Sequence, residues 1–157
     1  MPTAAILTIS DTRSAGTRED TTTTLMTELL REAGIEVVAT QLVRDEHDEI
    51  AAAIMQFADQ ANLILTSGGT GLAPRDVTPE ATRSVLDREA PGIAEAMRAE
   101  TARLQPLAWL SRAVAGQRGT TLVVNLPGNP KAVRECLDVL VPMHPHALKL
   151  SAGGDQH

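Results

Sequence analysis

The stretch LILTSGGTG at residues 63–71 decides the fold of this chain. A short apolar run ends there in three glycines within four residues, Gly68, Gly69 and Gly71. Glycine weakens strands, so these glycines do not serve strand stability. They permit positive φ angles and let backbone amides approach an anion closely. We expect a buried strand at 62–66 that runs into an anion-binding loop. A tight turn that needs glycine for geometry alone is the alternative.

The glycine loop matches neither of two common phosphate-binding motifs. It lacks the Gly-Lys-Ser/Thr ending of a P-loop and the GxGxxG spacing of a dinucleotide-binding turn. We therefore predict a nest of backbone amides rather than a helix N-terminus as the anion site. The residues predicted to bind phosphate here are Ser67, Gly68, Gly69, Thr70 and Gly71.

Strand and helix patterns alternate on both sides of the loop. Further apolar runs that read as strands lie at 4–9, 35–43 and 120–126. Helical spacing of apolar residues is found at 20–33, 46–59, 78–88, 91–104, 129–142 and 144–150. Residues 105–119 carry no clear pattern. The alternation predicts an α/β fold, one domain over residues 1–157, with helices on both faces of a mostly parallel sheet.

Chemistry is expected where the strands end, because open parallel sheets bind ligands beyond the carboxyl ends of their strands. Four loops hold that position, at residues 10–20, 44–48, 67–76 and 127–130. Ser10 begins a hydroxyl-rich loop that could cradle a polar ligand or simply form local turns. The turn formed by Pro127, Gly128 and Asn129 could direct amides at a ligand, although helix capping alone explains part of it.

Two aspartates in these loops are candidates for Mg²⁺ binding. Asp76 follows the glycine loop, and Asp45 follows the second predicted strand. Hard cations bind carboxylate oxygens beside phosphates, so both side chains could serve one metal. The alternative is a solvated loop acid, and it is stronger for Asp45 because residues 44–48 are charged throughout.

The composition excludes several functional classes. The net charge of −6 opposes binding to nucleic acid or anionic lipid, and aromatic residues make up only 1 % of the chain. The single Cys136 falls on an amphipathic pattern and reads as a buried packing residue. The four histidines read as surface residues. With no signal peptide or long apolar run, we expect a cytoplasmic protein that does not contact a membrane.

These motifs together resemble the Mog/MoaB family of molybdenum cofactor biosynthesis. The resemblance rests on the glycine loop, the RDVTPEA segment at 75–81, the LSRAVAG segment at 110–116 and the LPGNPK turn at 126–131. It also includes the opening Ser10-Asp11 with Gly16 and Asp20, and it covers nearly the whole chain.

The resemblance implies a three-layer αβα sandwich and adenylyl transfer. In that reaction molybdopterin and ATP give adenylyl-molybdopterin and pyrophosphate, with Mg²⁺, and a separate molybdate-inserting enzyme uses the product. The resemblance further implies a homotrimer or homohexamer, catalytic roles for Asp45 and Asp76, and a substrate-binding role for Ser111. The choice between the Mog-like and MoaB-like branches stays open, as does which loop holds ATP and which molybdopterin.

Two other functions remain as alternatives. One is a non-catalytic molybdopterin carrier of the MoaB-like branch, for which loss of the two aspartates would be the sequence mark. The other is a nucleotide pyrophosphatase related to the competence-damage proteins, which usually carry an additional domain.

Overall fold

The computed structural model describes residues 1–17 and 19–154, and a six-stranded sheet runs through its middle in the order β2-β1-β3-β6-β5-β4. Neighbours among the first four strands in this order are parallel, whereas β5 and β4 are antiparallel additions. The strands are β1 (Thr3–Ile9), β2 (Glu36–Val43), β3 (Leu63–Ser67), β4 (Arg88–Glu89), β5 (Ala115–Arg118) and β6 (Thr121–Leu126).

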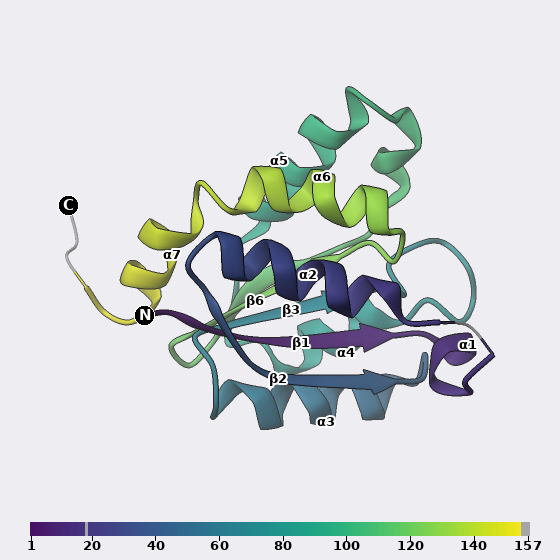
Figure 1. The fold of residues 1–157 in the computed structure, drawn as a ribbon, viewed down its shortest axis with the longest axis horizontal. Helices are drawn as coiled ribbons and strands as arrows, with labels where there is room; N and C mark the ends of the chain where they lie inside the picture. Colours follow the sequence, from purple (N-terminus) through teal and green to yellow (C-terminus); the bar gives the residue numbers. More distant parts are fainter. Residues whose placement is uncertain (18, 155–157) are drawn as a thin grey trace.

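Helices cover both faces of this sheet, as Figure 1 shows. The helices are α1 (Asp11–Ser14), α2 (Thr21–Glu32), α3 (His47–Ala58), α4 (Thr78–Val85), α5 (Pro91–Ala102), the 3₁₀ helix η1 (Pro106–Leu110), α6 (Pro130–Leu140) and α7 (His144–Ser151). On one face, α2, α5, α6 and α7 enclose an aliphatic core with the sheet. On the other face, α3 and α4 enclose a second core. The predicted three-layer sandwich with a mostly parallel sheet is confirmed.

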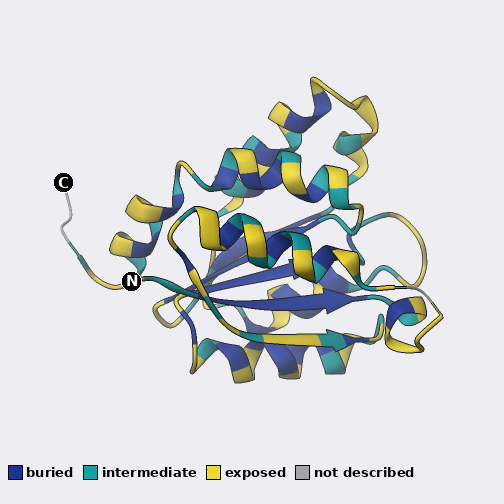
Figure 2. Cartoon of the chain, viewed as in Figure 1, coloured by how far each residue is buried: buried dark blue, intermediate teal, exposed yellow. Residues whose placement is uncertain are grey.

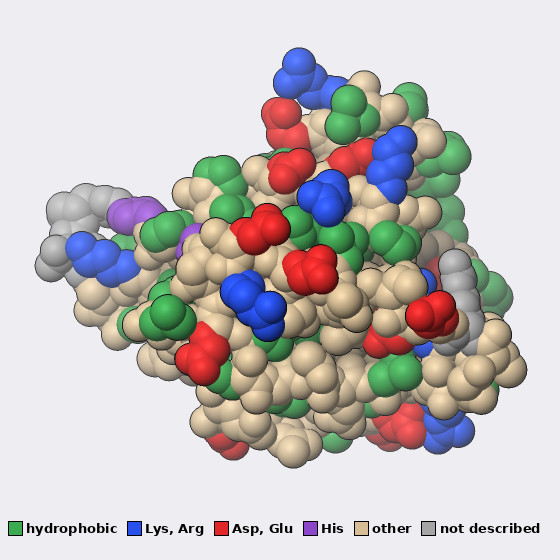
Figure 3. All heavy atoms as spheres, viewed as in Figure 1, with side chains coloured by type: hydrophobic (Ala, Val, Ile, Leu, Met, Phe, Trp, Pro, Cys, Tyr) green, Lys and Arg blue, Asp and Glu red, His purple; other side chains and the backbone are tan. Residues whose placement is uncertain are grey.

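The central strands are mainly apolar, which is typical of strands covered on both faces of a sheet. Every residue of β3 and β6 is buried, whereas β2 at the sheet edge alternates between exposed and partly buried positions. Figure 2 shows this contrast between the dark central strands and the lighter edge. On the face seen in Figure 3, acidic and basic side chains are interspersed over α2 and α6, so positive charge is dispersed there.

The structure corrects the sequence-based elements at several places. The predicted loop at 10–20 begins with the one-turn helix α1, and its residue 18 lies outside the described part. The helix predicted to reach residue 88 ends at Val85, because Arg88 and Glu89 pair with β5. Residues 105–119 contain η1 and β5, which are too short to show a period.

The burial of Cys136 and of the histidines can be compared with the sequence-based predictions. Cys136 is 7 % exposed, which confirms it as a packing residue. The surface prediction is wrong for His144, which is buried at the start of α7 and donates a hydrogen bond from Nδ1 to the Val141 carbonyl. His47 and His146 are exposed as predicted, and His157 lies outside the described residues. Thr78 precedes Pro79, a pattern that predicts Thr78 as the helix cap, but the cap of α4 is Val77.

Within the described residues, none of the helices combines the length and the apolar character that crossing a membrane would need.

Candidate active site

The four strand-end loops meet at one edge of the sheet. The register aligns Ile9 of β1 with Val43 of β2, and Ser67 of β3 with Leu126 of β6. Beyond these residues, the Ser10 amide donates to the Val43 carbonyl at 2.9 Å, and the Gly68 amide donates to the Leu126 carbonyl at 3.0 Å. The parallel register thus gathers all the predicted loops into a single site.

Close backbone packing explains two of the loop glycines. Gly68 has a φ of 102°, and a Cβ atom there would lie 2.3 Å from the Ile9 carbonyl oxygen. Gly69 has a φ of 69°, and a Cβ atom there would lie 2.3 Å from Thr78 Oγ1 and 3.0 Å from Asp45 Oδ1. The geometric requirement for glycine is therefore real, and an anion-binding role has to rest on other evidence.

That evidence comes from the orientation of the loop's peptide groups. The carbonyls of Gly68 and Gly69 accept bonds from the Thr78 hydroxyl at 3.0 Å and the Thr78 amide at 3.1 Å. The carbonyls of Thr70 and Gly71 accept bonds from the backbone amide and Nε of Arg112, both at 2.8 Å. Within residues 1–17 and 19–154, no hydrogen bond uses the amides of residues 69–71. The loop therefore turns its acceptors toward the protein and leaves three amide donors without a partner among the described residues.

The two predicted aspartates flank this loop. Asp45 Oδ1 lies beside Gly69, and Asp76 Oδ2 lies beside Gly71, where a Cβ atom would be 2.8 Å away. Asp76 Oδ2 also accepts a bond from the Ala73 amide at 3.2 Å. Burial raises the pKa of the Asp45 carboxyl, and the negative charges of Asp11 and Asp76 raise it further. The structure thus brings Asp45 and Asp76 to the same loop from two different strand ends.

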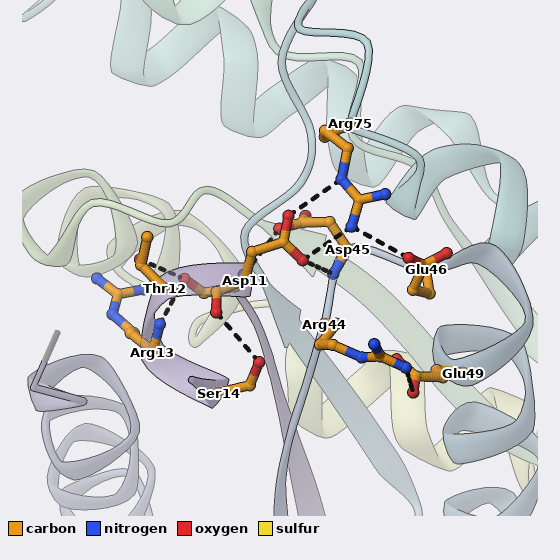
Figure 4. A network of polar contacts seen from close by, with 10 residues as sticks. Asp11, Thr12, Arg13, Ser14, Arg44, Asp45, Glu46, Glu49 and Arg75 are labelled. Atoms are coloured by element: carbon orange, nitrogen blue, oxygen red, sulfur yellow. Dashed lines mark hydrogen bonds and ion pairs between the residues drawn. The ribbon is translucent and has the colours of Figure 1, made fainter. Parts of the chain in front are cut away.

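A network of charged side chains connects three of the loops (Figure 4). Asp11 accepts a bidentate bond from the Arg75 guanidinium, with both nitrogen–oxygen distances at 3.0 Å. Arg75 also donates to Glu46 at 3.2 Å. The Arg75 guanidinium holds the pKa of the Asp11 carboxyl below its usual value. This network joins α1, the loop before α3 and the segment after the glycine loop.

Arg112 is a positioning residue that the sequence analysis did not identify. Besides its bonds to the glycine loop, its guanidinium donates to the Asp76 carbonyl at 2.6 Å and to the Glu80 carboxylate at 2.7 Å. It therefore fixes the loop and the backbone of Asp76 together. Its position inside the LSRAVAG segment was the only available signal, since the surrounding residues show no period.

The remaining predicted residues differ in what their side chains do. The Ser67 hydroxyl is buried and donates to the Pro127 carbonyl at 2.8 Å, so it ties β3 to the turn before α6. Thr70 is also buried. Asn129 caps α6 by accepting bonds from the Lys131 and Ala132 amides, as its sequence context predicted. Gly128 lies against Gly68, where a Cβ atom on Gly128 would be 3.4 Å from the Gly68 Cα atom.

Two predicted serines also have defined partners. Ser10 caps α1 by accepting a bond from the Arg13 amide at 3.3 Å. The Ser111 hydroxyl accepts a bond from the Ala113 amide at 3.2 Å.

A pocket of about 320 Å³ adjoins this edge of the sheet. It lies between α5, η1 and α6, and Ser111, Pro127 and Asn129 contribute to its wall. Most of the other lining side chains are apolar or small, including Met97, Ala132 and Cys136. The wall also includes charged side chains, among them Arg98, Lys131 and Glu135, and a concave pocket that combines apolar and polar groups is typical of a small-molecule site.

The described residues contain no group of three or more His, Cys, Asp or Glu side chains that could hold a metal by themselves. The carboxylates of Asp45 and Asp76 nevertheless fit Mg²⁺, which is usually bound through one or two carboxylates together with substrate phosphates. The site can therefore combine backbone donors and a dication around a phosphorylated ligand.

Comparison with known proteins supports this interpretation. Residues 5–146 match the family described as "Probable molybdopterin binding domain". The chain is 40 % identical over 152 residues to the molybdopterin adenylyltransferase of Helicobacter pylori strain J99, a match that covers 94 % of this chain and 86 % of that protein.

Solved structures of the same family are also similar to this chain. The molybdopterin biosynthesis enzyme MoaB from Thermus thermophilus is 51 % identical, with a TM-score of 0.93 and full coverage of both chains. A MogA structure is 37 % identical, with a TM-score of 0.91 over 95 % of this chain and 99 % of that one.

Proposed function

The chain belongs to the molybdopterin-binding family of molybdenum cofactor biosynthesis, and we propose that it is a molybdopterin adenylyltransferase. It transfers the adenylyl group of ATP to molybdopterin and releases pyrophosphate. The observation that carries the proposal is the glycine loop: its amides at 69–71 have no partner among the described residues, and it has Asp45 beside Gly69 and Asp76 beside Gly71. That arrangement suits a triphosphate better than an uncharged ligand.

The reaction needs positioning and charge stabilisation more than covalent catalysis. An oxygen of the molybdopterin phosphate attacks the α-phosphorus of ATP, and the bond to the bridging oxygen of pyrophosphate breaks. The amides of residues 69–71 bind phosphate oxygens, and Arg112 keeps them oriented by holding the carbonyl side of the loop. Asp45 and Asp76 would hold Mg²⁺, which supplies positive charge against the triphosphate.

The pocket between α5 and α6 is a candidate binding site for the pterin ring. It is concave and largely apolar, and Ser111 and Asn129 stand in its wall beside the strand-end loops. We assign the pterin ring to this pocket and the ATP phosphates to the glycine loop. The assignment places the two substrates on either side of the carboxyl ends of β3 and β6.

The proposal also includes features that rest on family resemblance. These are a homotrimeric or homohexameric assembly, a cytoplasmic location and a downstream molybdate-inserting enzyme. The carrier alternative is less favoured, because both Asp45 and Asp76 are retained and both lie at the glycine loop.

A pyrophosphate-release assay tests the proposal. Purified protein with Mg-ATP and molybdopterin should release pyrophosphate and form adenylyl-molybdopterin, whereas ATP alone should give neither. Pyrophosphate release from ATP alone would favour the pyrophosphatase alternative. The Asp76→Asn variant should bind molybdopterin normally and lose turnover. Molybdopterin binding without turnover in the wild-type protein would identify a carrier.

A further inference from the structure

Arg13 is a buried cation that has no counter-charge among the described residues. Its side chain is on α1, and the residue is only 7 % exposed. No acceptor within the described part of the chain lies within hydrogen-bonding distance of its buried Nε atom. None of the ion pairs among the described residues includes Arg13. A buried charge is normally paired, so an unpaired guanidinium needs an explanation.

The position of Arg13 relates it to the candidate active site. Ser10, at the carboxyl end of β1, accepts a bond from the Arg13 amide, and the two residues lie three positions apart on one helical turn. The carbonyl of Ile9, just before this turn, contacts the glycine loop at Gly68. In Figure 4 the Arg13 guanidinium lies beside Thr12, on the opposite side of Asp11 from Arg75.

The other two arginines of the site, Arg75 and Arg112, donate hydrogen bonds to groups of the protein itself. Arg75 makes three bonds to the carboxylates of Asp11 and Glu46. Arg112 binds two backbone carbonyls and the Glu80 carboxylate through its guanidinium. In contrast, the Arg13 guanidinium donates to no other described residue, and its buried Nε has no partner there. A guanidinium fork matches phosphate oxygens in geometry and charge.

We propose that Arg13 binds a phosphate group of a substrate at this site. The inference rests on the proposed function only for the identity of the phosphate compound. The phosphate could belong to the ATP triphosphate or to molybdopterin. The unpaired charge then has a physical reason, because the ligand supplies the counter-charge that the described residues do not.

Binding and stability measurements on Arg13→Met test this proposal. Affinities for pyrophosphate, Mg-ATP and molybdopterin are measured by calorimetry at a temperature where all variants are folded. We expect Arg13→Met to weaken at least one of them by about 10- to 100-fold, the range for a lost hydrogen bond to a charged group. Arg13→Lys keeps the charge but not the fork, so its affinity for that ligand should lie between those of Arg13→Met and the wild type.

The melting temperature of the ligand-free protein separates binding from structure. Arg13→Met should melt no lower than the wild type, because it removes an unpaired buried charge, and its melting temperature should rise less on ligand addition. Arg31→Met is the matched control, since exposed Arg31 lies in the last turn of α2 and should alter neither affinity nor ligand response.

The pattern of affinities identifies the source of the phosphate. Weaker binding of pyrophosphate and Mg-ATP alone points to the nucleotide, and weaker binding of molybdopterin alone points to its terminal phosphate. Unchanged affinity of Arg13→Met for all three ligands overturns the inference. If the melting temperature of that variant is also lower, Arg13 has a structural role. If the wild-type protein turns over but Arg13→Met binds all three ligands normally, this inference is refuted and the proposed function is not. Arg13-dependent pyrophosphate binding without turnover refutes the proposed function alone.

Discussion

The backbone amides of Asp11 and Asp45 each donate a hydrogen bond to the other residue's carboxylate. The Asp45 amide donates to Asp11 Oδ1 at 3.0 Å, and the Asp11 amide donates to Asp45 Oδ2 at 3.1 Å. Each carboxylate therefore fixes the backbone that carries the other. Asp11 is held in turn by Arg75, so the orientation of Asp45 above Gly69 depends on residues from three strand ends.

Replacing Asp11 should therefore impair catalysis through Asp45. Asp11→Ala removes the acceptor for the Asp45 amide and the bidentate partner of Arg75, and kcat/KM should fall about 10- to 100-fold, because small misplacements in a site are that costly. Ser14→Ala, in the same helix, is the control, since its exposed hydroxyl only donates to the Asp11 carbonyl. Steady-state kinetics with Mg-ATP measures both. Activity of Asp11→Ala within twofold of wild type would contradict the coupling.

Gly69→Ala should disrupt the glycine loop by more than its backbone angle explains. A methyl group there meets Thr78 Oγ1 at 2.3 Å, whereas Gly34 has a similar φ of 80° and nothing within 4 Å. Gly34→Ala should thus report the cost of the positive φ alone, about 1–2 kcal/mol. Urea unfolding should give a larger loss for Gly69→Ala, with turnover abolished. Equal losses for the two variants would show that the contact is relieved without strain.

Arg112→Met should destabilise the protein and weaken substrate binding together. The substitution leaves the Gly71 and Asp76 carbonyls without their guanidinium donors, at a cost on the order of 2 kcal/mol for the free energy of unfolding. Glu80→Gln is the control, because a half-exposed ion pair contributes only about 0–1 kcal/mol. Chemical denaturation and Mg-ATP affinity measure the two effects. A Glu80→Gln variant as impaired as Arg112→Met would assign the role to the ion pair instead.

Ala132→Phe should block the pocket between α5 and α6 without affecting the glycine loop. The added ring occupies space that we assign to the pterin, so the KM for molybdopterin should rise at least tenfold while Mg-ATP affinity stays the same. Ala52→Phe places the same ring at an exposed position of α3 and should be neutral. Loss of Mg-ATP affinity in Ala132→Phe would place the nucleotide in this pocket.

The Cys136 thiol should be unreactive in the folded protein. Burial raises its pKa to about 12, with a further contribution from Glu135, so almost no thiolate exists near neutral pH. Because the pKa is raised, reactivity should increase only as the pH rises toward that value. Alkylation by iodoacetamide at pH 8 should be slow in native protein and fast in guanidinium. Rapid alkylation of Cys136 in the native protein would show that the wall of the pocket between α5 and α6 opens.

Repetitive and locally encoded features could be predicted from the sequence. The apolar runs of β1, β3 and β6 are continuous because both faces are covered, and Asp20 and Asn129 identify helix starts through their own side chains. The two aspartates at strand ends were found by the rule that parallel sheets bind ligands at one edge.

Features that depend on distant residues could not be predicted. Arg112 contacts Gly71 across 41 positions, and no local pattern encodes such a bond. The strand β4 has two residues and exists only because β5 lies beside it. The burial of His144 likewise depends on how α7 packs, which its own composition does not reveal.

The hydrogen bond from Ser67 to the Pro127 carbonyl has a consequence for how the protein folds during its own translation. It joins residues 60 positions apart, and the paired residues of β3 and β6 are 59 positions apart. When the glycine loop leaves the ribosome, the strand that supports it has not yet been translated. The phosphate-binding geometry is therefore completed late, once β6 has emerged. Nascent chains stalled before residue 120 should lack it even where the earlier strands have paired.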